Sequence, residues 1–170
     1  MQKNQTLKKL MIVTVMIALD IVLSPIMRVE GMAPMSSVMN IIAAVLLGPF
    51  WAVVMATITG IMRMMIYGVP PLALTGAIFG AFCAGLCYRL LPKWPSAMFG
   101  EFIGTGIIGS LLSVPVMAWV TGQHNQLNWL LFTPRFVGAT IIGSVIAYFI
   151  LLSLSKIDLF KDVQALFRKF

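Results

Sequence analysis

Four ionisable residues lie within strongly apolar stretches of the sequence: Asp20, Arg63, Glu101 and Arg135. A charge at the centre of a membrane-spanning helix costs about 2.5–3.5 kcal/mol or more, so such residues face protein or water and have a partner. Two kinds of chemistry suit these four positions. They can form ion pairs that fix helix packing, or they can make polar contacts to a ligand inside the bundle. Both alternatives stay open at each position.

Residue types that could support catalysis or bind a metal do not come together in the sequence. His124 is the single histidine, and it lies in a polar stretch with no Cys, Asp or Glu nearby. A metal site or a general base needs further groups at suitable spacing. Cys83 and Cys87 are one helical turn apart in an apolar run, which favours packing over a disulfide. We therefore expect no enzyme activity, no cofactor and no bound metal.

The composition places these residues in a membrane protein. Of 170 residues, 60% are hydrophobic and 10% are charged, and the mean hydropathy is +0.99. Soluble domains have about a quarter of their residues charged. A soluble fold of this length could not bury so much apolar surface, so lipid must cover the remainder. The net charge of +7 lies at the ends of apolar runs, which argues against nucleic-acid binding.

Apolar runs between turn signals predict an all-α integral membrane bundle of six transmembrane helices. The expected segments are 9–27, 38–47, 50–67, 72–91, 96–120 and 129–154. The second segment is shorter than the roughly 20 residues of a regular span, so it should be tilted, broken or re-entrant. After these segments, residues 156–170 alternate charged and apolar side chains at helical spacing. We interpret 1–155 as the transmembrane domain and 156–170 as a cytoplasmic amphipathic helix on the membrane surface.

The basic residues fix the orientation of this predicted bundle. With the N-terminus inside, the outer loops hold only Arg28. The inner side then holds Lys3, Lys8, Lys9, Arg89, Lys93, Lys156, Lys161, Arg168 and Lys169. Such asymmetry predicts a multi-pass protein of a bacterial inner (plasma) membrane with both termini in the cytoplasm.

This orientation also predicts the depth of the intramembrane charges. Asp20, Arg63 and Arg135 should lie towards the outer face, where a ligand would arrive. Glu101 should lie near the cytoplasmic end of its helix. It would pair there with a basic residue of the inner surface or with a polar group of the bundle.

Small residues spaced four apart mark expected helix contacts. They are Gly76, Gly80 and Ala84 in one segment, and Gly100 and Gly104 in the next. Such spacing lets helix backbones approach closely in lipid, so we expect packing within the chain at these positions. The first helix has no other small stripe than Thr14 and Ala18, and these two residues are predicted to contact a partner subunit.

Three stretches of the sequence resemble a known family. They are residues 34–49 (PMSSVMNIIAAVLLGP), 60–63 (GIMR) and 100–109 (GEFIGTGIIG). Together they make the chain similar to the ThiW-type substrate-binding subunits (S components) of energy-coupling factor (ECF) vitamin transporters. That subgroup is assigned to hydroxyethylthiazole, the thiazole precursor of thiamine.

The resemblance implies a fold, a ligand and partners. Such subunits bind a vitamin near the outer face, under the loop between the first two helices. They join a transmembrane coupling subunit and two ATPase subunits, which drive uptake. Their first helix often carries small residues four apart against the coupling subunit. The match here is Thr14 and Ala18 rather than a pair of alanines.

A candidate site follows where the residue pattern and the resemblance agree. The stretch 28–37 is polar and contains Gly and Pro, as a lid would. Methionines would give an adaptable apolar lining for a thiazole ring, and a few polar groups would orient the ligand. An interfacial position explains Trp129 without any ligand, but this residue could still stack on a flat ring. The candidate substrate-binding residues are Met32, Met35, Asn40, Arg63, Glu101, Thr105, Trp129 and Arg135.

Other functions remain open on the sequence alone. The same fold could bind another small vitamin, or a phosphorylated thiazole that Arg63 and Arg135 would clamp. Alternatively, the chain could be a structural membrane protein whose buried charges only hold helices together. A small intramembrane enzyme is disfavoured because the catalytic constellation is missing.

Overall fold

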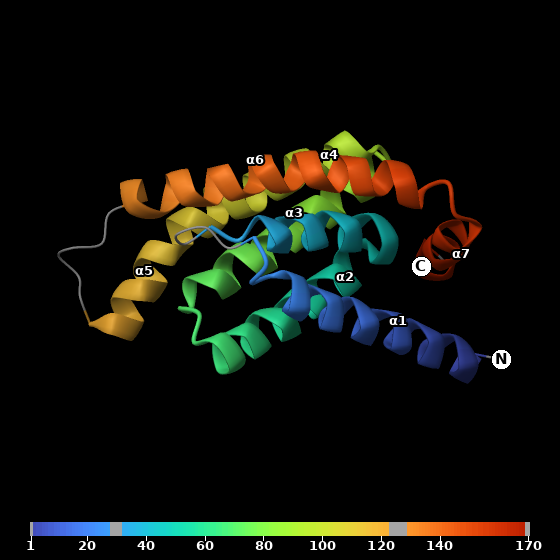
Figure 1. Ribbon diagram of the computed structural model, residues 1–170, viewed down its shortest axis with the longest axis horizontal. Helices are drawn as coiled ribbons and strands as arrows, with labels where there is room; N and C mark the ends of the chain where they lie inside the picture. The colour runs from blue at the N-terminus through green and yellow to red at the C-terminus, as the bar shows by residue number, and fades with distance from the viewer. Residues whose placement is uncertain (1, 28–31, 123–128, 169–170) are drawn as a thin grey trace.

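The computed structural model describes residues 2–27, 32–122 and 129–168, which form an elongated bundle of helices (Figure 1). Both ends of the chain lie at the same end of this bundle. The elements are α1 (Gln2–Leu23), α2 (Pro34–Tyr67), α3 (Leu72–Leu90), α4 (Trp94–Glu101), the π-helical stretch η1 (Phe102–Gly109), α5 (Ser110–Thr121), α6 (Trp129–Leu154) and α7 (Asp158–Arg168).

Helix α2 doubles back on itself, so that it forms two limbs, 34–47 and 49–67 (Figure 1). The turn is at Gly48, whose φ of 76° and ψ of 177° lie outside the helical region. Glycine adopts such angles without steric cost, and the following Pro49 lacks the N–H that would continue the helix. The second and third segments predicted from the sequence are therefore confirmed as separate helices. The first limb starts at Pro34 rather than Val38.

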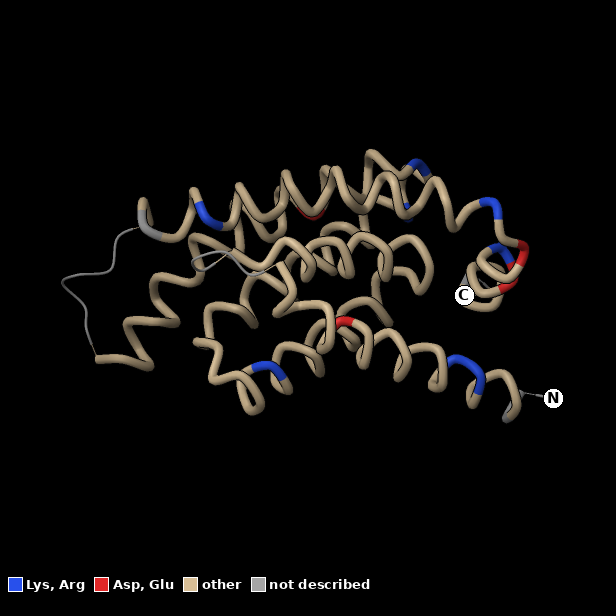
Figure 2. Tube along the Cα trace, viewed as in Figure 1, with Lys and Arg blue, Asp and Glu red and all other residues tan. Residues whose placement is uncertain are grey.

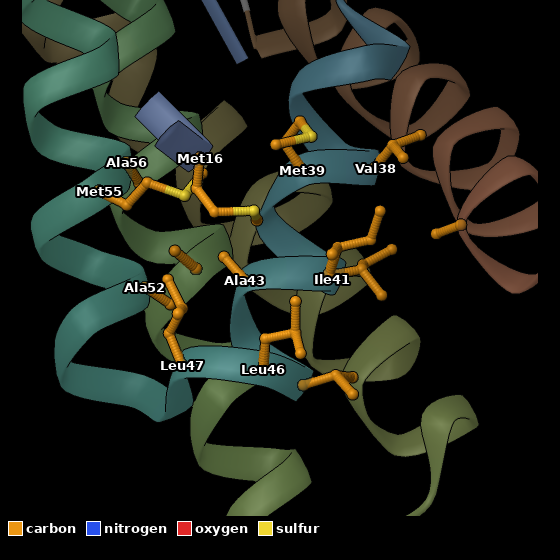
Figure 3. Packing of buried hydrophobic residues seen from close by; sticks show 14 of the residues in the cluster. Met16, Val38, Met39, Ile41, Ala43, Leu46, Leu47, Ala52, Met55 and Ala56 are labelled. Carbon is orange, nitrogen blue, oxygen red and sulfur yellow. The ribbon is translucent and has the colours of Figure 1, made fainter. Parts of the chain in front are cut away.

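The first limb of α2 is the centre of the bundle. Every residue from Pro34 to Leu47 is buried, including the polar Ser36, Ser37 and Asn40, which share one face of the helix. Figure 3 shows Met39 and Ala43 on this limb facing the returning limb, which carries Ala52, Met55 and Ala56. At 1.5 Å per residue the first limb is about 21 Å long, less than the roughly 30 Å of a bilayer core. The predicted short segment is confirmed, and a cavity lies at each of its ends.

Helices α4, η1 and α5 follow one another without a break and pack closely on α3. A Cβ atom on Gly100 would lie 2.7 Å from the Ala84 Cα, and one on Gly104 would lie 2.8 Å from the Gly80 Cα. Such separations are too short for real Cβ atoms, so only glycine permits this approach. The predicted packing within the chain at these small residues is confirmed, and the structure shows that the two stripes meet each other.

Four of the described helices are long and apolar enough to cross a membrane: Pro34–Tyr67, Leu72–Leu90, Trp94–Thr121 and Phe132–Leu154. The first of these is counted once although it is bent into two limbs. Helix α1 is not among the four because Lys8, Lys9 and Asp20 leave it without a long uncharged run. The regular elements of the described residues are thus all helical, as predicted, with six helical segments before α7.

Helix α7 is docked against the bundle. Phe160 and Phe167 on its apolar face are buried and belong to the main hydrophobic core. Gln164 Nε2 donates hydrogen bonds to the Val45 carbonyl oxygen at 3.0 Å and to Tyr88 Oη at 2.8 Å. The helix predicted within 156–170 is confirmed, but much of the apolar face that the sequence assigns to lipid is covered by protein.

Candidate substrate-binding site

A cavity of about 170 Å³ lies beside the start of the first limb of α2. It is bounded by both limbs of α2, the turn before α3, the first half of α3, the α4–η1 junction and α6. Six of the eight residues predicted for substrate binding line it: Met32, Asn40, Arg63, Glu101, Thr105 and Arg135. Met35 packs in the hydrophobic core instead, and the Trp129 side chain is 54% exposed. Neither of these two lines the cavity.

The innermost polar residues of the cavity, Asn40, Glu101 and Thr105, form one cluster. Asn40 Nδ2 donates to Glu101 Oε1 at 3.2 Å and to the Ala77 carbonyl oxygen at 3.3 Å. The Thr105 hydroxyl lies 2.8 Å from both Glu101 Oε1 and the Gly76 carbonyl oxygen. These bonds fix the Glu101 side chain from both sides and tie α2, α3 and η1 together.

Gly80 on α3 makes room for this cluster. A Cβ atom at Gly80 would overlap Thr105 Oγ1, would lie 2.5 Å from Glu101 Oε2 and would lie 3.0 Å from Asn40 Nδ2. Any larger residue would have to displace all three polar groups. The sequence identifies Gly80 as a packing residue, but only the structure shows that it packs against the cavity's polar cluster.

Two acceptor atoms of the cluster have no hydrogen-bond partner. They are Asn40 Oδ1 and Glu101 Oε2, on side chains that are 1% and 0% exposed. Ser37 lies beside the Glu101 carboxyl group but makes no hydrogen bond of standard geometry to Oε2. An unsatisfied buried acceptor costs about 1–3 kcal/mol, and proteins rarely leave such atoms without a reason. Both residues belong to the cavity lining, but the two atoms themselves have almost no accessible surface, so a ligand's donor would reach them only after a small shift of the neighbouring side chains.

The two arginines of the cavity differ in their surroundings. Arg63 is buried, and its Nη1 donates to Ser36 Oγ at 2.9 Å. Asp20, buried on α1, lies within electrostatic reach of Arg63 and accepts a hydrogen bond from Ser24 Oγ at 2.9 Å. Arg135 is half-buried on α6. Across the described ranges of the chain, Arg135 has no hydrogen bond or ion pair to the protein.

The predicted pairing of Glu101 with a polar group of the bundle is confirmed, but its predicted separation from the other intramembrane charges is not. The prediction puts it near the cytoplasmic end of its helix, apart from the other intramembrane charges. In the structure it lines the same cavity as Arg63 and Arg135, and its partners are polar groups of the bundle. The reason is that α4 begins at Trp94, so Glu101 lies about 10 Å along the helix, level with Asn40 on the short limb of α2.

The sequence analysis misses the apolar wall of the cavity on α6. Phe132, Phe136 and Ala139 are buried and line it. Their spacing of four and three residues puts them on one helix face, and this is the signal that could have identified them. The π-helical stretch η1, which carries Thr105, is also missed. Such stretches occur frequently at functional sites.

Several other predicted residues are placed outside the cavity. Thr14 and Ala18 are exposed on the outward face of α1, so they are accessible, and a partner contact there stays a prediction. His124 and the first part of the predicted lid, residues 28–31, fall outside the described residues. Within the described ranges, no three His, Cys, Asp or Glu side chains come together in a way that could hold a metal ion.

Comparison with known proteins gives one match. A family model described as "Thiamine-precursor transporter protein (ThiW)" matches residues 10–157 of the chain. The match includes every residue that lines the cavity. No curated protein and no solved structure matches the chain.

Proposed function

The chain belongs to the ThiW family of thiamine-precursor transporter proteins, and we propose that it is the membrane subunit that captures hydroxyethylthiazole. The cavity beside the first limb of α2 is the proposed binding site. In this proposal the chain binds and releases its ligand without any chemical change to it.

The size of the cavity supports a ligand with a single ring. An engineered protein cavity of about 150 Å³ accommodates benzene, and the cavity here measures about 170 Å³. Hydroxyethylthiazole has one small ring with a methyl group and a two-carbon arm, whereas thiamine has two linked rings. The volume therefore favours the precursor over the complete vitamin.

The two unsatisfied acceptors are the observation that carries the proposal. Asn40 Oδ1 and Glu101 Oε2 are buried at the cavity without a donor. The hydroxyl group of hydroxyethylthiazole has one proton to donate and would satisfy either atom. The ring would then lie against Phe132 and Phe136 on α6 and beside the sulfur of Met32. Contacts of sulfur with aromatic rings are favourable and suit a thiazole.

A phosphorylated thiazole is the second candidate, and one observation favours it. Arg135 lines the cavity and has no partner among the described side chains. A half-buried guanidinium group is well suited to bind a phosphate through two hydrogen bonds. Arg63 lines the same cavity and would add to the positive potential.

We further propose that the chain works as an ECF-type S component in a bacterial inner membrane. In that role α1 would contact a transmembrane coupling subunit through Thr14 and Ala18, and two ATPase subunits would supply the energy. The basic residues gather mainly at the end of the bundle that holds both termini (Figure 2). This distribution supports cytoplasmic termini, because positive charge accumulates on the cytoplasmic side. The substrate cavity would then open towards the outside.

Calorimetric titration of the purified chain in detergent tests the ligand. We expect hydroxyethylthiazole to bind with a Kd of about 1 μM or less, which corresponds to about −8 kcal/mol. Thiamine should bind at least about tenfold more weakly, since it does not fit. Tighter binding of the phosphorylated thiazole would select the second candidate. If a folded, monodisperse preparation binds none of the three compounds, the proposed function is wrong.

A further inference from the structure

A second cavity, of about 650 Å³, lies at the other end of the first limb of α2. Its walls come from the Gly48–Pro49 turn, the end of α3, the start of α1 and the docked helix α7. It shares no lining residue with the substrate cavity. It lies at the end of the bundle where both termini are found (Figure 1).

The polar part of this second cavity is positively charged. Lys9 and Arg89 line it, and no Asp or Glu does so among the residues that the structure describes. The Lys9 side chain is only 7% exposed, and its Nζ lies 5.5 Å from the centre of the Phe167 ring. A buried lysine held over an aromatic ring is a fixed cation rather than a mobile surface charge. Gln164 and Tyr88 add hydrogen-bonding groups to the same wall.

The opposite part of the cavity is apolar. Leu46, Leu47, Pro49, Phe50 and Trp51 line it, and the Phe50 side chain is 69% exposed. An apolar floor beside fixed cations matches an amphiphile with an anionic head and a hydrocarbon chain. A soluble phosphate would match the cations but would leave the apolar floor uncovered.

We propose that this cavity binds one anionic phospholipid. Its phosphate is held by Lys9 and Arg89, and one acyl chain lies along the apolar floor formed by the α2 turn. The position agrees with this occupant, since cations between helices at the cytoplasmic end of a bundle bind anionic headgroups. The lipid would fill the space between α7 and the α2 turn, and so it would stabilise the docked position of α7.

Quenching of Trp51 tests the proposal, because this tryptophan lines the cavity and Trp94, Trp119 and Trp129 do not. The purified chain in neutral detergent is titrated with phosphatidylglycerol or phosphatidylcholine, each with brominated acyl chains. Subtracting the quenching measured for a Trp51→Phe variant leaves the quenching of Trp51 itself. We expect saturable quenching by the anionic lipid, and an apparent affinity at least about tenfold weaker for the neutral lipid.

A matched pair of variants separates the cavity from general surface charge. The Lys9→Gln/Arg89→Gln variant should bind the anionic lipid with an apparent affinity about tenfold or more weaker than that of the wild type. The Lys93→Gln/Lys156→Gln variant loses the same charge from exposed residues outside the cavity, and it should bind like the wild type. Affinity for hydroxyethylthiazole, measured in parallel, reports folding and the separate substrate site.

Four outcomes would overturn the proposal. One is equal binding of the anionic and neutral lipids. Another is an equal loss of affinity for the anionic lipid in both double variants. The third is full displacement of the lipid by millimolar inorganic phosphate, which would identify a site for a soluble anion. If instead the cavity receives a segment of a partner protein, the isolated chain will show no saturable lipid quenching, which counts equally against the lipid.

Discussion

Asn40 Nδ2 lies 3.2 Å from Glu101 Oε1, although the two residues are 61 positions apart in the sequence. This contact joins the buried limb of α2 to the junction of α4 and η1. It also leaves the second oxygen of each side chain, Asn40 Oδ1 and Glu101 Oε2, at the cavity without a partner. The pair therefore joins two distant helices at the proposed ligand site.

Replacing Glu101 by Gln should weaken hydroxyethylthiazole binding while the fold is kept. Glutamine has nearly the same shape, but an amide nitrogen replaces one carboxyl oxygen, so the ligand's hydroxyl could no longer donate to that atom and would have to accept from it instead. A loss of about 1–2 kcal/mol corresponds to a roughly five- to thirtyfold weaker Kd. Calorimetric titration measures it. An unchanged Kd in the folded variant would exclude a ligand contact at Glu101.

Replacing Gly80 by Ala should reduce both stability and ligand affinity. The new Cβ would collide with Thr105, Glu101 and Asn40, and overpacking of this kind costs about 1–3 kcal/mol. The thermal unfolding midpoint in detergent and the Kd for hydroxyethylthiazole measure the two effects. The matched control is Gly106→Ala, whose Cβ would come no closer than 3.4 Å to its nearest neighbour. Equal losses of stability and of ligand affinity in the two variants would show that contact with the polar cluster is not the cause.

Replacing Arg135 by Gln should distinguish the two candidate ligands. The Arg135 guanidinium group lines the cavity and is not needed by any described side chain, so the fold should tolerate its loss. If the ligand is phosphorylated, removing the charge-assisted hydrogen bonds should weaken binding of the phosphate about tenfold or more. Binding of unphosphorylated hydroxyethylthiazole should change little. A stronger effect on the unphosphorylated compound would count against a phosphate contact at this residue.

Replacing Arg63 by Gln should destabilise the protein, because Arg63 is buried and bonded to Ser36 and acts on the buried Asp20. Removing one member of a buried charge pair costs about 3–5 kcal/mol, since the other charge is left uncompensated. Adding Asp20→Asn should therefore recover part of the lost stability. Unfolding midpoints of both single variants and the double variant give the coupling. Purely additive losses would show that Asp20 and Arg63 do not interact.

Replacing Gly48 by Ala should destabilise the α2 hairpin. The space around Gly48 is open, with no atom within 4 Å of an added Cβ, so only its backbone angles matter. A φ of 76° with a ψ of 177° suits glycine alone, and a strained residue costs about 1–3 kcal/mol. Gly68→Asn is the control, because its φ of 60° and ψ of 27° form a helix cap that asparagine tolerates. The control should unfold at nearly the wild-type temperature.

The sequence alone determines the protein's class and the segments of its helices. Long apolar runs with few charges require lipid, and helix α6 has the predicted limits, Trp129–Leu154. The break at Gly48–Pro49 and the close approach of α3 to η1 are also predictable. These features depend on local properties, namely hydropathy, the missing N–H of proline and the small volume of glycine.

Only the tertiary structure decides which side chains meet. In a soluble helix the polar face points to water, but the first limb of α2 is buried all round although Ser36, Ser37 and Asn40 form a polar stripe on one face. This stripe indicates which face of the helix is polar, but it does not show which segments of the chain that face meets. The rotation of the limb about its axis points Asn40 into the cavity and Met35 into the core. The relative heights of the helices likewise bring Glu101 level with Asn40, because they depend on packing between segments that are far apart in the chain.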